Sequence, residues 1–200
     1  MNTVDPTVDL VDRALTQMGE VIAAIRPEQA TLATPCVGWN VQALVRHVIG
    51  QSLRNFLDSA RGEIADWAAP PAELSPNWTA EYRAAAAPVL DVWHRADLER
   101  PVPVPGGAEA PLRSRADQQI TELAMHTWDL ARATNQTIDL DQEVAEYGLA
   151  WSHKMLRPEF RGPDKAFDLE VPVPPDAPAY DRLAGWFGRD PSWKSPGPQE

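Results

Sequence analysis

The stretch Ile120–Gln136, ITELAMHTWDLARATNQ, is the part of the sequence that says most about the fold. Its apolar residues recur at the three- and four-residue spacing of an amphipathic helix. The same segment carries Glu122 and His126, whose four-residue separation places both side chains on one helix face, about 5–6 Å apart. A carboxylate and an imidazole at this spacing can hold one metal ion, form a plain surface pair, or act as an acid/base couple. The spacing alone leaves all three interpretations open.

Further helices are predicted on both sides of this stretch. The pattern of apolar residues and capping residues gives these spans: Thr7–Ile25, Asn40–Arg61, Thr79–Leu98, Ser114–Asn135, Asp141–Leu156 and a short helix at Ala179–Phe187. Asn40 and Ser114 are expected to cap the starts of their helices, and Gly62 follows the end of another. Pro88 lies inside its helix and is expected to kink or split it.

The arrangement of these helices predicts an all-α protein, a helical bundle with long crossover connections. No hairpin or sustained alternating strand is evident, and the proline-rich segments 101–107 and 171–175 are expected to be extended loops or edge pieces. We expect residues 1–157 to form the bundle. Residues 158–200 are expected to form a short, Pro-rich extension that packs on it and ends in a loose terminus.

Composition excludes several classes of partner. The chain has 200 residues and a net charge of −11, whereas nucleic acids and anionic membranes call for a basic surface. No apolar run approaches the roughly 20 residues of a membrane span. The first residues carry acids where a signal peptide carries bases, so a cytoplasmic protein is expected. Cys36 is the only cysteine, which excludes an intrachain disulfide and a metal site made of several thiolates.

Other polar and aromatic residues have plainer interpretations. His94 and His153 are expected at the surface, and Cys36 is expected to be a small, partly buried residue and not a nucleophile. Asp129 and Arg132 fit a local ion pair along the helix. Trp128 fits a core anchor, or the wall of a pocket beside the neighbouring histidine. The sequence contains no P-loop, G-x-G-x-x-G, H-E-x-x-H or G-x-S-x-G motif.

Three segments, in this order, carry a resemblance to a known family. They are TPCVGWNVQALVRHVIG (Thr34–Gly50), the stretch Ile120–Gln136, and VPVPPDAPAYDRLAGWFGRDP (Val171–Pro191). Together they resemble actinobacterial metal-binding proteins related to mycothiol-dependent maleylpyruvate isomerase, within the DinB-like superfamily. The resemblance covers nearly the whole chain. It implies a four-helix bundle with a metal at one end.

The resemblance also implies a ligand set of His47, Glu122 and His126. Two histidines and one glutamate leave coordination positions open, as in catalytic zinc sites. The implied metal is zinc, with nickel or another first-row metal as alternatives, and mycothiol is the implied cosubstrate. The implied chemistry is S-transfer to a small electrophile, or its isomerisation, with the metal holding the thiolate. A non-catalytic metal-binding protein and a hydrolase that uses metal-activated water are the alternatives.

The remaining expectations concern the substrate and the assembly. Trp128, Arg54 and Arg46 are candidate substrate-binding residues near the mouth of the site, and no catalytic residue is assigned. The partners are expected to be a small-molecule thiol and an electrophile, and the protein a monomer or homodimer. The sequence departs from the isomerase in two respects. It reads GWN at Gly38–Asn40 where GWD is common, and a short tail stands where the isomerase has a further domain that contributes to its active site.

Overall fold

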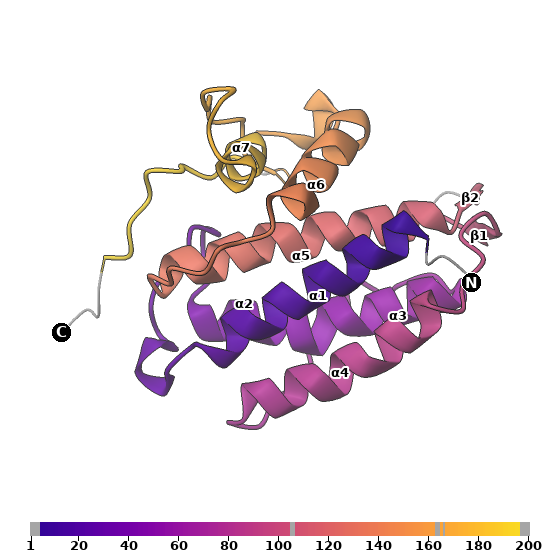
Figure 1. Ribbon diagram of the computed structural model, residues 1–200, viewed down its shortest axis with the longest axis horizontal. Coiled ribbons are helices and arrows are strands. Elements are labelled where there is room, and N and C mark those ends of the chain that lie inside the picture. Colours follow the sequence, from indigo (N-terminus) through magenta and orange to yellow (C-terminus); the bar gives the residue numbers. More distant parts are fainter. Residues whose placement is uncertain (1–4, 105–106, 163–164, 166, 197–200) are drawn as a thin grey trace.

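The computed structural model describes residues 5–104, 107–162, 165 and 167–196 (Figure 1). Helices dominate this part of the chain: α1 Pro6–Ala23, α2 Val41–His47, α3 Leu53–Arg61, α4 Trp78–Trp93, α5 Arg113–Ala133, α6 Gln142–Met155 and α7 Ala179–Trp186. A π-helical turn, η2 Val48–Ser52, joins α2 to α3, and 3-10 turns lie at η1 Pro27–Gln29 and η3 Pro158–Phe160. The predicted all-α fold is confirmed.

Four helical rods form the bundle, and two more helices lie outside it. The long helix α5 packs against α1 and α2, while α4 packs against α1 and α3. Helices α6 and α7 lie together on the opposite side of α5 from α3 and α4 (Figure 1). Helix α5 is therefore covered on several sides, which explains why most of its residues from Gln119 onward are buried. None of the helices in the described part of the chain is long and apolar enough to cross a membrane.

The helix boundaries follow local chemistry, with one correction at α5. Asp5 caps α1 by accepting a hydrogen bond from the Thr7 amide, and Asn40 caps α2 through the Ala43 amide, as predicted for Asn40. Gly62 ends α3 in the left-handed conformation (φ 87°) that glycine adopts without strain. The prediction that Ser114 caps the next helix is wrong. Helix α5 begins at Arg113, and the Ser114 hydroxyl donates to the Pro111 carbonyl.

Pro88 does not split its helix. Helix α4 is continuous from Trp78 to Trp93, shorter than the predicted span, which reached Leu98. A proline removes the hydrogen bond to the carbonyl four residues earlier, here that of Ala84. Because Ala84 is exposed, water can satisfy that carbonyl, and the cost of the missing bond stays small.

A short hairpin corrects the expectation that no hairpin forms, and one of its strands lies in the segment 101–107, where extended loops or edge pieces were expected. Strands β1 (Pro101–Pro103) and β2 (Glu109–Pro111) pair in antiparallel fashion. Backbone hydrogen bonds join Leu112 to Arg100 and Val104 to Ala108 on either side of the strands. In an antiparallel pair, hydrogen-bonded positions alternate with positions that form no bond to the partner strand. The three prolines occupy the positions between, whose amides point away from the partner strand. Proline costs nothing there, which explains how so proline-rich a segment forms strands.

The C-terminal extension packs on the bundle through α7. Helix α7 contacts both α6 and α5, and buries Tyr180 and Leu183 against them. The Arg132 guanidinium on α5 pairs with Asp181 on α7 at 2.8 Å. The division of the chain near residue 157 stays a prediction. The end of the expected loose terminus, residues 197–200, lies outside the described residues.

Candidate metal centre

Three side chains from two helices meet in the interior of the bundle, near the middle of α5. His47 ends α2, and Glu122 and His126 lie one turn apart on α5. Their ligand atoms all lie within 4.8 Å of one another. Glu122 Oε1 is 3.0 Å from His47 Nε2 and 3.4 Å from His126 Nε2. Ligands of one metal ion at bond lengths of about 2.0–2.2 Å stand roughly 3.3–3.6 Å apart, so the three groups have the spacing of a metal-binding set.

A π-helical turn shapes the surroundings of His47. It begins at the next residue and is closed by i→i+5 hydrogen bonds, such as that from the Leu53 amide to the Val48 carbonyl. Residue 52 therefore stands over residue 47, where in an α-helix it would point away. The Ser52 hydroxyl lies 3.1 Å from His47 Nε2 and donates to Glu122 Oε1 at 3.2 Å. Such turns are frequent at functional sites, and the sequence periodicity did not predict this one.

Gln51, on the same turn, fixes the orientation of the His47 ring. Its amide nitrogen donates to the carbonyls of Trp67 and Ala69, at 3.1 and 2.6 Å. Its Oε1 atom therefore faces His47 Nδ1, at 2.7 Å, and accepts a hydrogen bond from it. With the proton on Nδ1, the lone pair of Nε2 is directed toward Glu122.

His126 is oriented in the same way by a carboxylate. Its Nδ1 atom lies 3.1 Å from Asp129 Oδ2, one turn further along α5. The Asp129 side chain is fully buried, and Arg189 pairs with it from the segment after α7, at 3.2 Å. A carboxylate behind a histidine ligand is the usual outer partner in metal sites, because it fixes the ring and raises its basicity. The predicted local pair of Asp129 with Arg132 is wrong, since Arg132 turns to Asp181 instead.

The electrostatics of the cluster favour a positive charge beside Glu122. Burial disfavours the charged form of Glu122, but His126 and His47 outweigh it and hold its pKa well below the usual 4.5. Burial likewise opposes a charge on His126, yet Glu122 and Asp129 raise its pKa to about 9. Asp129 keeps a lowered pKa in spite of its burial, chiefly through Arg189 and then His126. A proton on His126 can supply the cation when no metal is bound, and a divalent metal can supply it when bound.

A cavity of about 570 Å³ opens beside these groups. All three lie in its wall, together with Trp39, Met125 and other residues of α5 and the extension. Its volume is typical of small-molecule sites. Cys36 also lines this cavity. The sequence did not predict this, because no histidine lies near Cys36 along the chain. Burial, together with the charge of Asp129, raises the pKa of this thiol to about 11, so Cys36 is a neutral wall residue and not a ready nucleophile.

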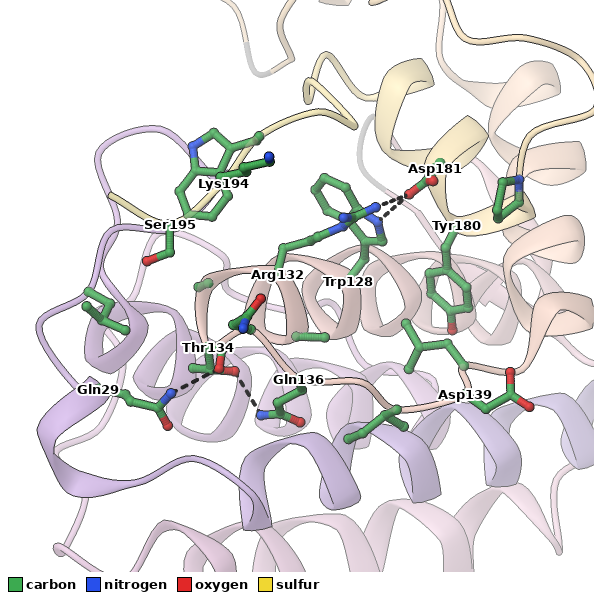
Figure 2. A pocket seen from close by; sticks show the side chains of 18 of the residues that line it. Gln29, Trp128, Arg132, Thr134, Gln136, Asp139, Tyr180, Asp181, Lys194 and Ser195 are labelled. Atoms are coloured by element: carbon green, nitrogen blue, oxygen red, sulfur yellow. Dashed lines mark hydrogen bonds and ion pairs between the residues drawn. The ribbon is translucent and has the colours of Figure 1, made fainter. Parts of the chain in front are cut away.

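The three candidate substrate-binding residues lie outside this cavity. Trp128 faces a separate pocket of about 940 Å³ on another side of α5, where it and Arg132 both donate to Asp181 (Figure 2). Arg46 donates to the carbonyls of Pro71 and Ala72, and Arg54 is exposed. These residues lie close to the ligands in the sequence. Neighbouring residues on a helix point in different directions, so closeness in the sequence did not bring them into the same cavity.

The other two histidines lie away from the cluster. His94 is exposed, as expected, but it pairs with Asp12 of α1 at 2.7 Å, an acidic partner that its own helix did not suggest. His153 is exposed and packs its ring edge against Trp186. Sequence reasoning missed Gln51, Ser52 and Arg189 as partners of the cluster. Only the last lies in a segment that carried a family resemblance.

The fold and the site together define a class, a DinB-like helical bundle with a candidate metal centre of two histidines and a glutamate. Residues 11–131 match the family model of the mycothiol maleylpyruvate isomerase N-terminal domain. The chain therefore belongs to this family, which confirms the resemblance seen in the sequence.

The chain is also similar to two curated proteins and, in fold, to two solved structures. Two uncharacterized proteins of Mycobacterium tuberculosis, from strains CDC 1551 and H37Rv, are each 33% identical over 186 residues, which cover 88% of this chain and 94% of theirs. The crystal structure of the mycothiol-dependent maleylpyruvate isomerase is similar in fold, with a TM-score of 0.52 at 17% identity. A histidine-to-alanine mutant of that enzyme gives 0.51 at 16%. Each match covers 72% of this chain and 66% of the isomerase chain, so about a third of that enzyme has no counterpart in the match.

Proposed function

We propose that the protein is a metal-dependent enzyme that uses a low-molecular-weight thiol of the mycothiol type to transfer sulfur to, or isomerise, a small electrophile. His47, Glu122 and His126 hold the metal, zinc or another first-row divalent ion. The observation that carries the proposal is that two imidazole Nε2 atoms, each with its Nδ1 side occupied by an acceptor, face one carboxylate oxygen. Such a convergence of lone pairs is stable only around a cation.

The donor set suits this chemistry. Two imidazoles and one carboxylate favour zinc, nickel and other first-row ions over magnesium or calcium, which prefer oxygen ligands. Three protein ligands leave coordination positions open toward the cavity, the pattern of catalytic sites. A metal bound there would lower the pKa of a thiol ligand, so that the nucleophilic thiolate exists at neutral pH.

The chain's own residues supply the rest of the site. Gln51 and Asp129 hold the two imidazole rings in position from behind. Trp39 packs its ring edge-on against His47, with the ring centroids 4.7 Å apart, and covers that ligand on the cavity side. Met125 adds a flexible apolar wall that can adapt to the body of a substrate. Cys36 stays protonated and so does not compete with an incoming thiol for the electrophile.

The isomerisation of maleylpyruvate itself is not part of the proposal, because about a third of the isomerase lies outside the match. We further propose a cytoplasmic protein, a monomer or homodimer, with a domain boundary near residue 157. A non-catalytic metal-binding protein and a hydrolase are the competing functions, and the experiment separates them.

The test starts with the metal content of protein purified without an affinity tag or chelator, measured by elemental mass spectrometry. We expect about one divalent metal per chain, lost in His47→Ala and His126→Ala. His94→Ala is the matched control, because His94 lies outside the cluster and should leave the metal in place. Wild-type protein that takes up no metal even when zinc is offered would reject the site.

The second step offers mycothiol and a panel of small electrophiles to the metal-loaded protein. Loss of free thiol or isomerisation of the electrophile, abolished in His126→Ala, supports the proposal. Metal without turnover favours a non-catalytic protein. Hydrolysis that proceeds equally without the thiol favours metal-activated water.

A further inference from the structure

Arg189 reaches the metal centre from outside the bundle because of a glycine. Helix α7 ends in a Schellman motif, in which Gly188 adopts a left-handed conformation (φ 83°) and the Arg189 amide donates to the Ala184 carbonyl at 2.9 Å. The chain therefore turns sharply after α7. This turn directs the Arg189 side chain toward α5, where it lies in the wall of the metal-site cavity with only 15% of its side chain exposed.

The partner of Arg189 is a carboxylate that cannot reach water. The Asp129 side chain has no exposed surface, and the guanidinium faces it as a fork, with Nε 3.4 Å from Oδ1 and Nη2 3.2 Å from Oδ2. A buried carboxylate without a paired charge is strongly destabilised. No lysine or other arginine pairs with Asp129 among the described residues, so Arg189 supplies the compensating charge.

The same carboxylate faces a proposed metal ligand. Asp129 Oδ2 accepts from His126 Nδ1, and the opposite atom of that ring, Nε2, faces Glu122. Asp129 Oδ2 stays opposite Nδ1 only while its carboxylate is held in place, and a displaced carboxylate would leave the ring free to adopt the other tautomer, with its proton on Nε2. That tautomer cannot bind a metal through Nε2.

We propose that Arg189 is a positioning residue of the metal centre. It holds the buried Asp129 as an acceptor, Asp129 holds the Nδ1–H tautomer of His126, and His126 thereby presents Nε2 to the metal. This inference rests on the proposed function, because it assigns the C-terminal extension a part in metal binding. The position of the extension, which carries Arg189, thus affects the orientation of the ligand His126 on α5.

A purely structural role predicts something different, and the chain contains a matched control. Arg132 also ties α5 to the extension, through Asp181, but it lies at the other pocket and touches no ligand (Figure 2). If Arg189 served only to dock the extension, loss of either arginine would affect the metal centre similarly. If Arg189 acts through Asp129, only its own loss changes the metal centre.

The experiment compares Arg189→Met, Arg189→Lys and Arg132→Met with the wild-type protein. The readouts are zinc affinity, by competition with a chelating dye, and the visible spectrum of the cobalt-substituted protein, which reports ligand geometry. We expect Arg189→Met to bind zinc about 10- to 100-fold more weakly, as for other outer partners of metal ligands, with an altered cobalt spectrum. Lysine restores the charge without the fork, and should recover part of the affinity. Arg132→Met should match the wild type in both readouts.

The outcomes separate this inference from the function on which it rests. A wild-type protein that binds no metal rejects the proposed function and the inference with it. A wild type that binds metal, with Arg189→Met equal to it in affinity and spectrum, rejects the inference alone. An equal effect of Arg132→Met also rejects it, in favour of simple docking. Should Arg189→Met fail to fold, ¹⁵N spectra of the His126 ring in the zinc-loaded wild type decide, because coordination through Nδ1 in place of Nε2 would overturn the proposal.

Discussion

Ser52 Oγ lies 3.1 Å from His47 Nε2, although the two residues stand five positions apart in one helical segment. In an α-helix, side chains at this spacing point in different directions. The π-helical turn η2 has more residues per turn, so it places residues five positions apart on the same face. The turn thereby adds Ser52 to the imidazole that Gln51, four positions after His47, already faces.

Ser52→Ala tests the contribution of this hydroxyl. Ser52 is fully buried, and its hydroxyl donates to Glu122 Oε1, so the substitution leaves the carboxylate with one hydrogen bond fewer. We expect the free energy of unfolding of the metal-free protein to fall by about 1.5–3 kcal/mol, measured by urea denaturation. Ser59→Ala, a buried serine of α3 outside the cluster, is the control and should cost less. Equal losses in the two variants would contradict a specific role for Ser52.

Gly50→Ala tests how the turn is fitted to its neighbour. A Cβ at Gly50 would lie 2.8 Å from the backbone nitrogen and oxygen of Ala72, and the Ala72 amide already donates to the Gly50 carbonyl. Because backbone atoms must move to make room, we expect a loss of about 1–3 kcal/mol in stability. The better helix propensity of alanine, about 1 kcal/mol at most, cannot offset it fully. An increase in the thermal unfolding temperature of the variant would contradict this, because it would show that the loop at Ala72 can move away without cost.

Metal binding should release a proton from His126. The pKa of His126 is raised to about 9, so the ring is protonated at pH 7–8 in the metal-free protein and must lose its proton to bind a metal. Affinity should therefore rise about tenfold for each pH unit up to roughly pH 9 and then flatten. Calorimetric titration with zinc in buffers of different ionisation enthalpy measures the protons released.

Asp129→Asn is the control for this proton release, because Asp129 helps to raise the His126 pKa. The variant should release fewer protons and show a shallower dependence on pH. Zinc affinity that does not change between pH 6 and 8 in the wild type would contradict a protonated His126.

Cys36 should react slowly with alkylating reagents. Burial, with Asp129 nearby, raises the pKa of its thiol to about 11, compared with the usual 9.0. The thiolate fraction at pH 8 is therefore roughly a hundredfold lower than for a free cysteine, and the rate of reaction with iodoacetamide should fall accordingly. The same protein in denaturant supplies the control, since its single cysteine is then exposed. Rapid modification of the folded protein would show that the thiol is activated.

The sequence by itself determined the helical fold and the pairing of two of the three candidate ligands. Apolar periodicity located the helices because a helix buries one stripe of its own surface, a property of consecutive residues. The four-residue spacing of Glu122 and His126 placed them on one face for the same reason. His47 joined them only through a family resemblance, because no local rule relates residues 75 positions apart.

Tertiary structure alone decided the rest. The hairpin formed because its prolines fall between the hydrogen-bonded positions, a question of register that composition does not answer. Trp128 and Arg132 face a second pocket, and Arg189 reaches Asp129 across 60 residues. These outcomes depend on which elements pack together and on how each is rotated about its axis. Packing against distant parts of the chain sets that rotation, so the rotation cannot be predicted from the periodicity of a single segment.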